Sequence, residues 1–452
     1  MDYKLKEVYA VLEIKNYSFS FMVGVYTESQ IKVLYKRHLE YHFCDNGIII
    51  DEKNVAKELV NLIKDANRQL GIVIERVAIS IPANNMTIKT STKMLNLTHH
   101  RLITNNDIDS LITLAKEVPL LDDETAFFIR PYRYILNEQK ALSAPPIGRA
   151  AHKVSIKAIV YVTKKQIIQS IFATLKYAKI EVMGILPEGF SLAWNIASPV
   201  DLQNGITIIN WDYDNVIAYV FVRETLCEQI IIPGGIKKII TRLRNVLSCD
   251  NKQSLKYLYK IINLNNNSKD NLIIYSKYDH QQQTQLNFTH YDLKRIVNHV
   301  LTEEMETLSE KLANSLGRYN YPVVVVGEIL RISGFKENLL SLNKDKNVTV
   351  YIASTLGSKE TWCTGLLGNI YYQHLANKVS ATNIQSVDHR YIRYLNNNGD
   401  KKGPRNDKYG EHHQPGGNVN PAQGVMPLSK QHLNGSQQYR QKYYQNIKIL
   451  NK

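Results

Sequence analysis

Two short turns hold the residues whose types and spacing bear most directly on chemistry. One lies in VLEIKNYSF (11–19) and the other in IINWDYDNVIAY (208–219), and each joins two extended apolar runs that predict a β-hairpin. Turns of this kind hold phosphate oxygens with backbone N–H groups, which requires glycine because a Cβ blocks close approach. The turns instead hold Lys15, Asn16 and Tyr17 in the first copy, and Asp212, Tyr213 and Asp214 in the second. The pattern indicates a nucleotide-binding frame whose phosphate loops lack glycine.

The elements around each turn repeat in the same order. A third strand follows each hairpin, at 30–35 and at 228–232, and each half later supplies a helix and a buried strand. In the first half these are an amphipathic helix at 51–70 and a strand at 76–81. The repetition predicts an α/β protein with two similar lobes that face a cleft.

A small α+β insertion interrupts the first lobe. Strands are expected up to residue 97, at 127–136 and at 154–162, with a helix that a capping box at Thr104 and Asp107 opens. A second capping box, Thr163-x-x-Gln166, predicts a helix over 166–177. A third, Thr289-x-x-Asp292, opens a predicted helix over 291–314 within a polar segment rich in Asn and Gln.

The composition limits which classes of protein this chain can belong to. The chain has 452 residues, 44% of them hydrophobic, which is enough for several domains with real cores. Its four cysteines form no C-x-x-C pair, so they indicate neither a zinc site nor a disulfide framework. No apolar run approaches the ~20 residues of a spanning helix, so we expect any membrane contact to be peripheral. The net charge of +15 favours anionic partners, although the Lys, Asn, Ile and Tyr content of an AT-rich genome explains it equally well.

From about Tyr9 to Tyr372 the order of elements resembles FtsA, the actin-like cell-division family of bacteria. VAISIPANN, ITNNDIDSLITLAKEV, APPIGRA and VYVTKKQIIQSIFATLKYAKIEVMGILPEGFSLAW follow the order of the family's subdomain 1C and its flanks. IIIPGGIKKI resembles the Ile-Pro-x-Gly-Gly segment after the second phosphate loop. QSLKYLYK resembles the Ala-Glu-x-Leu-Lys segment, and VVVVGEILRISGF resembles the adenosine loop.

The departures from the family pattern lie in the nucleotide cleft. The first phosphate loop keeps Glu13 but has Lys15 in place of glycine. The second loop reads Asp-Ile-Gly-Gly-Gly-Thr-Thr-Asp in the family. It aligns here with residues 210–217, NWDYDNVI, which contain no glycine. We therefore expect weak or absent ATP binding, no meaningful hydrolysis and no cofactor, whereas the family resemblance itself implies ATP with magnesium. The sequence shows no separate metal site. The residues assigned to this degenerate cleft are Glu13, Lys15, Asn16, Tyr17, Ser18, Asn210, Asp212, Tyr213, Asp214, Gly234, Gly235, Lys256, Gly327, Glu328 and Gly334.

The resemblance implies an actin-like (RNase H-like) fold of two lobes with the following division of the chain. Subdomain 1A comprises 1–83 and 164–203, with a closing helix at 356–377, and subdomain 1C is inserted into it at 84–163. Subdomain 2A comprises 204–249 and 320–355, and subdomain 2B, at 250–319, lies between these two parts in the sequence. The composition of residues 378–435 predicts a disordered linker.

The last segment, 436–452, predicts an amphipathic helix. Tyr439, Tyr443, Ile447 and Leu450 fall within roughly 80° of arc in a helical projection. Basic residues lie beside and opposite this stripe, which suits a helix lying in an anionic lipid interface, as in the family's membrane-targeting helix. The alternative is a frayed basic tail, because so short a peptide is only marginally helical in water. The residues assigned to the anchor are Tyr439, Arg440, Lys442, Tyr443, Ile447, Lys448, Leu450 and Lys452.

The resemblance implies a scaffold on the cytoplasmic side of the cell membrane at the division site. It would bind the C-terminal peptide of FtsZ through 2B (about 250–319), on the face of the 291–314 helix, and would associate with itself into filaments. The alternatives are an active actin-like ATPase and a pilus-assembly protein of the PilM type. Nucleic acid is not an expected partner, because aromatic and basic residues alternate mainly at 439–444.

Overall fold

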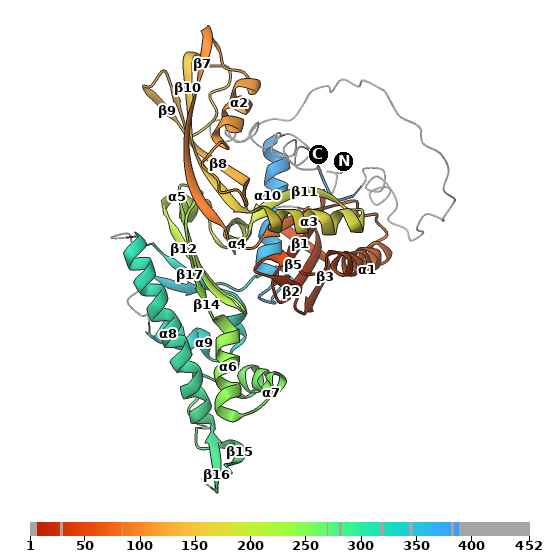
Figure 1. The fold of residues 1–452 in the computed structure, drawn as a ribbon, viewed down its shortest axis with the longest axis vertical. Helices are drawn as coiled ribbons and strands as arrows, with labels where there is room; N and C mark the ends of the chain where they lie inside the picture. The colour runs from red at the N-terminus through yellow and green to blue at the C-terminus, as the bar shows by residue number, and fades with distance from the viewer. Residues whose placement is uncertain are drawn as a thin grey trace, which may run out of the picture.

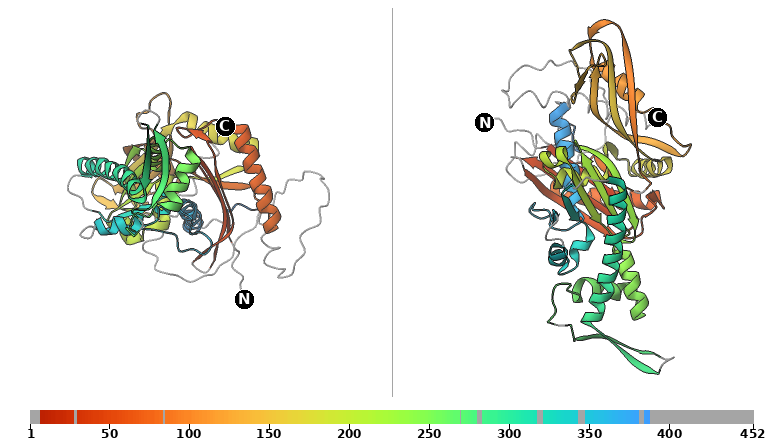
Figure 2. Two further views of the ribbon diagram at one scale, coloured as in Figure 1. Left: turned by 90° about the horizontal axis from the view of Figure 1, so that it is seen from below. Right: turned by 90° about the vertical axis from the view of Figure 1, so that its left-hand side faces the viewer.

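The computed structural model describes residues 7–27, 30–83, 85–268, 270–279, 283–316, 321–342, 347–380 and 384–387. Two lobes stack along the long axis of the molecule, with the insertion at one end and a long hairpin at the other (Figure 1). Two further views show the same elongated arrangement (Figure 2).

Lobe one is built on a five-stranded sheet in the order β11-β6-β1-β2-β3. β1 pairs antiparallel with β2 and parallel with β6, which in turn pairs parallel with β11. The strands are β1 (Glu7–Ile14), β2 (Ser18–Thr27), β3 (Gln30–Glu40), β6 (Arg76–Ile81) and β11 (Glu181–Pro187), with a short β4–β5 hairpin (Cys44–Asp45, Ile48–Ile49).

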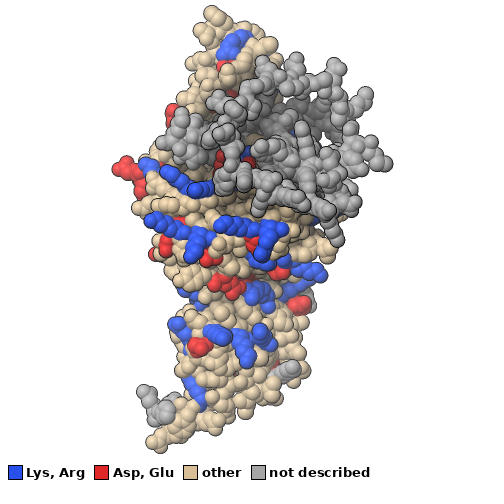
Figure 3. All heavy atoms as spheres, turned by 90° about the vertical axis from the view of Figure 1, so that its right-hand side faces the viewer, with Lys and Arg blue, Asp and Glu red and all other residues tan. Residues whose placement is uncertain are grey.

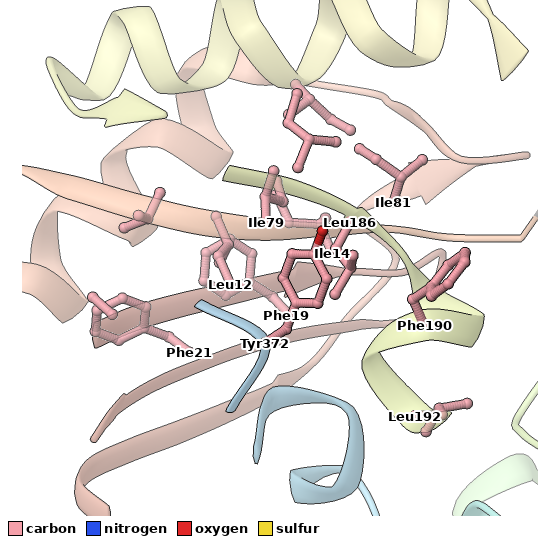
Figure 4. Close-up of a cluster of buried hydrophobic side chains, with 14 of the residues drawn as sticks. Leu12, Ile14, Phe19, Phe21, Ile79, Ile81, Leu186, Phe190, Leu192 and Tyr372 are labelled. Atoms are coloured by element: carbon pink, nitrogen blue, oxygen red, sulfur yellow. The ribbon is translucent and has the colours of Figure 1, made fainter. Parts of the chain in front are cut away.

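Helices cover both faces of this sheet. α1 (Glu52–Leu70) and α3 (Lys165–Ala178) pack on one face, while α4 (Glu188–Ile196) and α10 (Cys363–Ser380) lie on the other side. β1 is therefore buried on both faces. Alternate residues from Val8 to Ile14 join the larger cluster, and Tyr9 and Val11 face α10. Figure 4 shows part of the larger cluster, in which Leu12, Ile14 and Phe19 of the first hairpin lie beside Ile79 and Leu186 of the neighbouring strands.

The insertion is a four-stranded antiparallel sheet in the order β7-β10-β8-β9, with α2 packed on one face. Its elements are β7 (Thr87–Leu102), α2 (Asn105–Ala115), β8 (Glu124–Leu136), β9 (Lys140–Leu142) and β10 (Ala150–Lys164). The capping box of Thr104 and Asp107 is formed as predicted.

The capping box predicted at Thr163 and Gln166 is wrong. α3 begins at Lys165, its N-cap is Lys164 without a side-chain hydrogen bond, and the Thr163 hydroxyl is buried without a partner. The reason is that β10 continues through Lys164 in register with β8, which holds Thr163 in a strand.

Lobe two repeats the sheet of lobe one, in the order β14-β13-β12-β17-β18. β13 pairs antiparallel with β12 and β14, and β17 pairs parallel with β12 and β18. The strands are β12 (Ile206–Trp211), β13 (Asn215–Val222), β14 (Thr225–Pro233), β17 (Val323–Val326) and β18 (Val348–Val350). The helices are α5 (Pro199–Asn204), α6 (Gly235–Leu247), α7 (Asn251–Lys256), continued by a π-helical turn over 257–261, α8 (His290–Leu316) and α9 (Phe335–Leu342). α8 carries the predicted capping pair of Thr289 and Asp292. The hairpin of β15 (Ile273–Asp279) and β16 (Thr284–Thr289) projects at the end of this lobe.

The folded part extends beyond the predicted boundary at residue 377. α10 begins at Cys363 rather than near 356, because residues 356–362 form turns, and it runs to Ser380. Ile384–Val387 then return to lobe one as a strap. Ser386 lies between the starts of β1 and β6, where its N–H donates to Val8 O (2.9 Å) and its carbonyl accepts from Glu75 N (2.9 Å). Residues 388–452, with every residue of the predicted anchor, lie outside the described residues.

Candidate functional site

The two glycine-free turns have the same backbone geometry. The N–H of Lys15 donates to Ser18 O (2.8 Å), and the N–H of Asp212 donates to Asn215 O (2.9 Å). Each turn joins two neighbouring strands of its sheet and lies at the interlobe cleft. The side chains of the two turns therefore meet across the cleft.

Lys15 stands at the centre of this meeting. Its Nζ lies 2.6 Å from Asp212 Oδ2, 2.7 Å from Glu188 Oε1 and 3.6 Å from Glu13 Oε2. Glu13 and Glu188 are almost wholly buried, whereas about a fifth of the Lys15 side chain is exposed (21%). Glu188, at the start of α4, also accepts from Asn210 Nδ2 (3.1 Å) and from the Tyr219 hydroxyl (2.9 Å). One ammonium group therefore joins the lobes through three carboxylates.

The pKa values in this cluster follow from burial and from mutual charge. Burial raises the pKa of Glu13 to about 7, which Lys15 opposes and the Glu188 and Asp212 carboxylates reinforce. Burial alone would lower the pKa of Lys15, but the Asp212, Glu13 and Glu188 carboxylates outweigh it and hold that pKa well above its usual value. The pKa of Asp212 is lowered, because the effect of Lys15 exceeds the cost of burial. Lys15 is thus a permanent cation in this site.

The remaining turn residues close the gap beside Lys15. Asn16 Nδ2 donates to Asp214 Oδ2 (2.7 Å), and Lys237 Nζ of α6 donates to the Tyr17 hydroxyl (2.8 Å). The Tyr17 and Tyr213 rings lie 5.0 Å apart. Five side chains of the two turns and α6 therefore form contacts in the space between the turns. A phosphate group bound by both turns would have to occupy that space.

Beneath the second turn, the start of α6 is capped by the protein itself. The N–H of Gly235 donates to Glu304 Oε1 of α8 (2.8 Å). Gly235 has φ +62°, and a Cβ there would lie 2.3 Å from Asp212 O, so this position needs glycine. Burial raises the pKa of Glu304 to about 7, which the Gly235 N–H partly offsets. A helix N-terminus suited to an anion thus already holds a carboxylate.

A cavity of about 860 Å³ lies between the lobes beyond the closed turns. The predicted residues that line it are Glu13, Lys15, Tyr17, Ser18, Asn210, Asp212, Tyr213, Asp214, Lys256, Gly327 and Glu328. Asn16 and Gly234 instead line a second hollow, which residues of both lobes bound, and Gly235 lies under the second turn. Gly334 was misplaced in the cleft, because it packs on the loop at 263–265, where its Cβ would lie 2.5 Å from Asn265 N.

The far side of the cavity holds residues that the sequence did not single out. Arg331 lies over the Tyr259 ring (4.3 Å), 2.5 Å from Glu328 and 3.6 Å from Glu40 of lobe one. Trp362 stacks on His38 (4.9 Å). Trp362 thus lines the cavity and also packs against the cluster of α10.

This arrangement is poorly suited to phosphate chemistry. The Lys15 charge is already compensated, and the surrounding carboxylates repel phosphate oxygens. Within the described ranges no group of three or more His, Cys, Asp or Glu side chains has the geometry of a metal site. A magnesium nucleotide would have to displace Lys15 and separate the two turns.

A groove along α6 and α8 is the second candidate site. It consists of two adjoining hollows of about 740 and 440 Å³, which share Arg242 and His299. Lobe one also lines the larger hollow, through residues that include Asn16, His42 and Asp45. Val246, Phe288 and Ile296 supply apolar surface in the second hollow, beside Arg295. No salt bridge within the described ranges joins Arg242 or Arg295 to a carboxylate. We call this the α6/α8 groove.

Two lobes with repeated sheets around a cleft define an actin-like fold. Among solved structures, the PilM–PilN type IV pilus biogenesis complex matches with a TM-score of 0.55 and 8% identity over 81% of this chain and 98% of that chain. MreB5 of Spiroplasma citri bound to AMPPNP gives a TM-score of 0.45 and 10% identity, over 82% of this chain and 97% of that chain.

In sequence the chain is similar to the cell division protein FtsA. The Enterococcus hirae protein is 19% identical over 204 residues, which cover 45% of this chain and 46% of that protein, and the Enterococcus faecalis protein matches to the same extent. The chain spans about half the length of the curated relatives that it matches. No family model matches the sequence. The chain is thus an actin-fold protein with distant similarity to FtsA.

Proposed function

We propose that this protein is a scaffold of the FtsA type, which tethers FtsZ filaments to the cytoplasmic face of the membrane at the division site without turning over ATP. The observation that carries the proposal is the contact between the two turns, with Lys15 bound to Asp212 and Glu188. Among the described residues this contact occupies the space between the two turns, which argues against a phosphate there, while the actin-like fold is kept.

The closed turns also bear on assembly. In an actin-like protein the angle between the lobes governs the subunit shape that a filament requires. Here internal contacts set that angle, namely Lys15 with Asp212, Asn16 with Asp214, and Arg331 with Glu40. We infer that the protein associates into filaments without a nucleotide.

The α6/α8 groove is the proposed site for the FtsZ C-terminal peptide. It lies along α8, the helix to which the sequence analysis assigned the peptide without fixing residues, and Arg295, Ile296 and His299 of that helix line it. Among the described residues Arg242 and Arg295 form no salt bridge, and they adjoin apolar surface, which suits a peptide that has both acidic and apolar side chains.

Membrane attachment is proposed for residues 436–452 from the sequence pattern alone. No helix in the part of the chain that the structure describes is both long and apolar enough to span a bilayer. The proposal is therefore for a helix lying in the lipid interface.

The test is binding of a labelled FtsZ C-terminal peptide to the full chain. We expect the double variant Arg242→Glu, Arg295→Glu to lose about 2 kcal/mol or more of binding free energy, because charge reversal turns attraction into repulsion. Arg133→Glu, Arg149→Glu is the matched control on the insertion and should bind as the unchanged protein does. Equal affinity of all three proteins, or no binding by any, would exclude the proposed peptide site.

Calorimetry with ATP or ADP and magnesium tests the absence of a nucleotide cycle. We expect neither heat nor thermal stabilisation up to millimolar nucleotide. Micromolar binding would show that the turns open and would favour an active actin-like ATPase.

A pilus-assembly protein of the PilM type is the second candidate, because the PilM–PilN match covers 98% of the solved chain. Such a protein would bind a PilN-type partner and not the FtsZ peptide. The same binding assay with both partners separates the two functions.

A further inference from the structure

One face of lobe one carries an unusual number of exposed cations. On α1 the side chains of Lys53, Lys57, Lys64 and Arg68 are exposed and fall within about 60° of arc around the helix. The half-buried carboxylates Glu58 and Asp65 lie on the flank of α1 toward β3, where Asp65 accepts from Tyr35 (3.0 Å). α1 therefore presents a basic stripe away from its acidic flank.

The neighbouring helix α3 extends this stripe. It contains no acidic residue, and Lys176 and Lys179 at its C-terminal end are exposed. Tyr177 is 53% exposed and lies 5.7 Å from Lys53 Nζ, so the two helices share one surface. Figure 3 shows rows of Lys and Arg side chains on this side of the molecule. We call Lys53, Lys57, Lys64, Arg68, Lys176 and Lys179, with Tyr177, the α1/α3 basic face.

Local stability does not explain all of these cations. Arg68, Lys176 and Lys179 lie at helix C-termini, where the helix dipole favours positive charge. Lys53 and Lys57 lie in the first two turns of α1, where the dipole disfavours it. Of the six cations, only Arg68 forms a salt bridge within the described ranges, with Asp65 (2.8 Å). The surface is therefore charged without internal compensation.

The strap ends close to the α3 end of this face. The carbonyl of Ser386 accepts from Glu75 N and Arg76 N at the start of β6, and Glu75 O accepts from Glu181 N at the start of β11, two residues after Lys179. The described part of the chain thus ends at the edge of lobe one where β6 and β11 begin, near the C-terminal end of α3.

We propose that the α1/α3 basic face rests on an anionic lipid surface. The face is formed by two adjacent helices, its lysines have long apolar stems, and its exposed tyrosine is amphipathic, which together suit the headgroup region. The choice of lipid over another polyanion rests on the proposed membrane attachment and on the position of the strap. The surface itself is separate from the proposed C-terminal anchor.

The test is sedimentation of the full chain with vesicles of phosphatidylcholine alone or mixed with phosphatidylglycerol. The face variant carries Lys53→Gln, Lys57→Gln, Lys176→Gln and Lys179→Gln. The control removes the same charge from exposed lysines on other surfaces: Lys140→Gln, Lys252→Gln, Lys336→Gln and Lys359→Gln. Thermal melting of each variant verifies folding.

Each lysine near an anionic membrane strengthens binding roughly fivefold, so we expect the face variant to bind mixed vesicles at least about tenfold more weakly at low salt. The control should lose much less, and high salt should reduce the difference. Equal binding by the face variant and the control would overturn the proposal. A face variant that loses affinity for duplex DNA or polyglutamate but not for vesicles would also overturn it, in favour of a different polyanion.

Deletion of 436–452 distinguishes this proposal from the proposed anchor. If the deletion leaves vesicle binding unchanged and the face variant abolishes it, the anchor is wrong and the basic face stands. If the deletion releases the protein and the face variant matches the control, the anchor stands and the basic face is wrong.

Discussion

Replacement of Lys15 by methionine is the most direct test of the closed cleft. Methionine has a similar length and no charge, so the change removes the ammonium and little else. Asp212, Glu188 and Glu13 would then face one another across the lobes without a cation, although Lys15 Nζ lies within 3.6 Å of each of them in the unchanged protein.

The expected loss follows from the burial of these groups. Removal of one partner from a buried ion pair costs about 3–5 kcal/mol. The lower end applies here, because about a fifth of Lys15 is exposed (21%) and the pKa of Glu13 is already about 7, so that this carboxyl is partly neutral. At about 2–4 °C per kcal/mol, a loss of about 3 kcal/mol lowers the melting temperature by roughly 6–12 °C.

The loss depends on pH with a definite sign. The folded pKa of Glu13 is raised from 4.5 to about 7, so the folded state binds more protons than the unfolded state between these values, and stability from this group falls as the pH rises. Without Lys15 the carboxylates repel more strongly when ionised. The variant should therefore lose more stability near pH 8 than near pH 6.

Urea denaturation at both pH values measures the effect, with Lys157→Met as the control on the insertion. Lys157 lies on β10 and forms no salt bridge within the described ranges, so its replacement should change stability by less than about 0.5 kcal/mol. If Lys15→Met is as stable as the control near pH 8, or if its loss is the same at both pH values, Lys15 does not hold the lobes together.

Further expectations concern other parts of the chain. Glu304→Gln keeps an acceptor for the Gly235 N–H but cannot ionise, whereas the Glu304 pKa in the unchanged protein is raised to about 7. The unfolding free energy of the variant should therefore depend less on pH over about pH 6–8. An unaltered slope in denaturation experiments would contradict this. Ser386→Pro removes the N–H that donates to Val8 O and should lower the unfolding free energy by about 1–3 kcal/mol, as hydrogen exchange at β1 and β6 would show. Deletion of 436–452 should release the protein from anionic vesicles, and Ile447→Glu with Leu450→Glu should act like the deletion, because apolar insertion is lost. Unchanged sedimentation would exclude the anchor.

Local sequence pattern predicted most elements, and its failure at Thr163 has a clear cause. Thr104, Thr163 and Thr289 each precede an acceptor three residues later and a helical pattern. Two of them form caps, whereas Thr163 is held in β10 by pairing with Thr125 of β8, 38 positions earlier in the chain. A capping pattern contains no information about such a partner strand.

The sequence analysis assigned both turns to one cleft but gave no contacts between them. The binding of Lys15 to Asp212 was not anticipated. The sequence analysis did not select Glu188. It follows Pro187 in the first turn of α4, where the helix dipole favours any acidic residue, so its type and position indicate no special role. Only the approach of the two lobes brings Glu188 to Lys15, and spacing along the chain does not encode that approach.

The strap and α10 also determine the order in which the lobes can be completed during synthesis. Lobe two is a nearly continuous segment, and its sheet can form as soon as β18 has been made. Lobe one requires contacts between residues as far apart as Val8 and Gln385, a separation of 377 positions. Because such closure is slow and must await the last partner, lobe two can be completed while the face of β1 that α10 covers is still exposed. A ribosome that stalls before Cys363 would therefore hold one finished lobe and one sheet whose Tyr9 and Val11 face is uncovered, a substrate for chaperones rather than a partial scaffold.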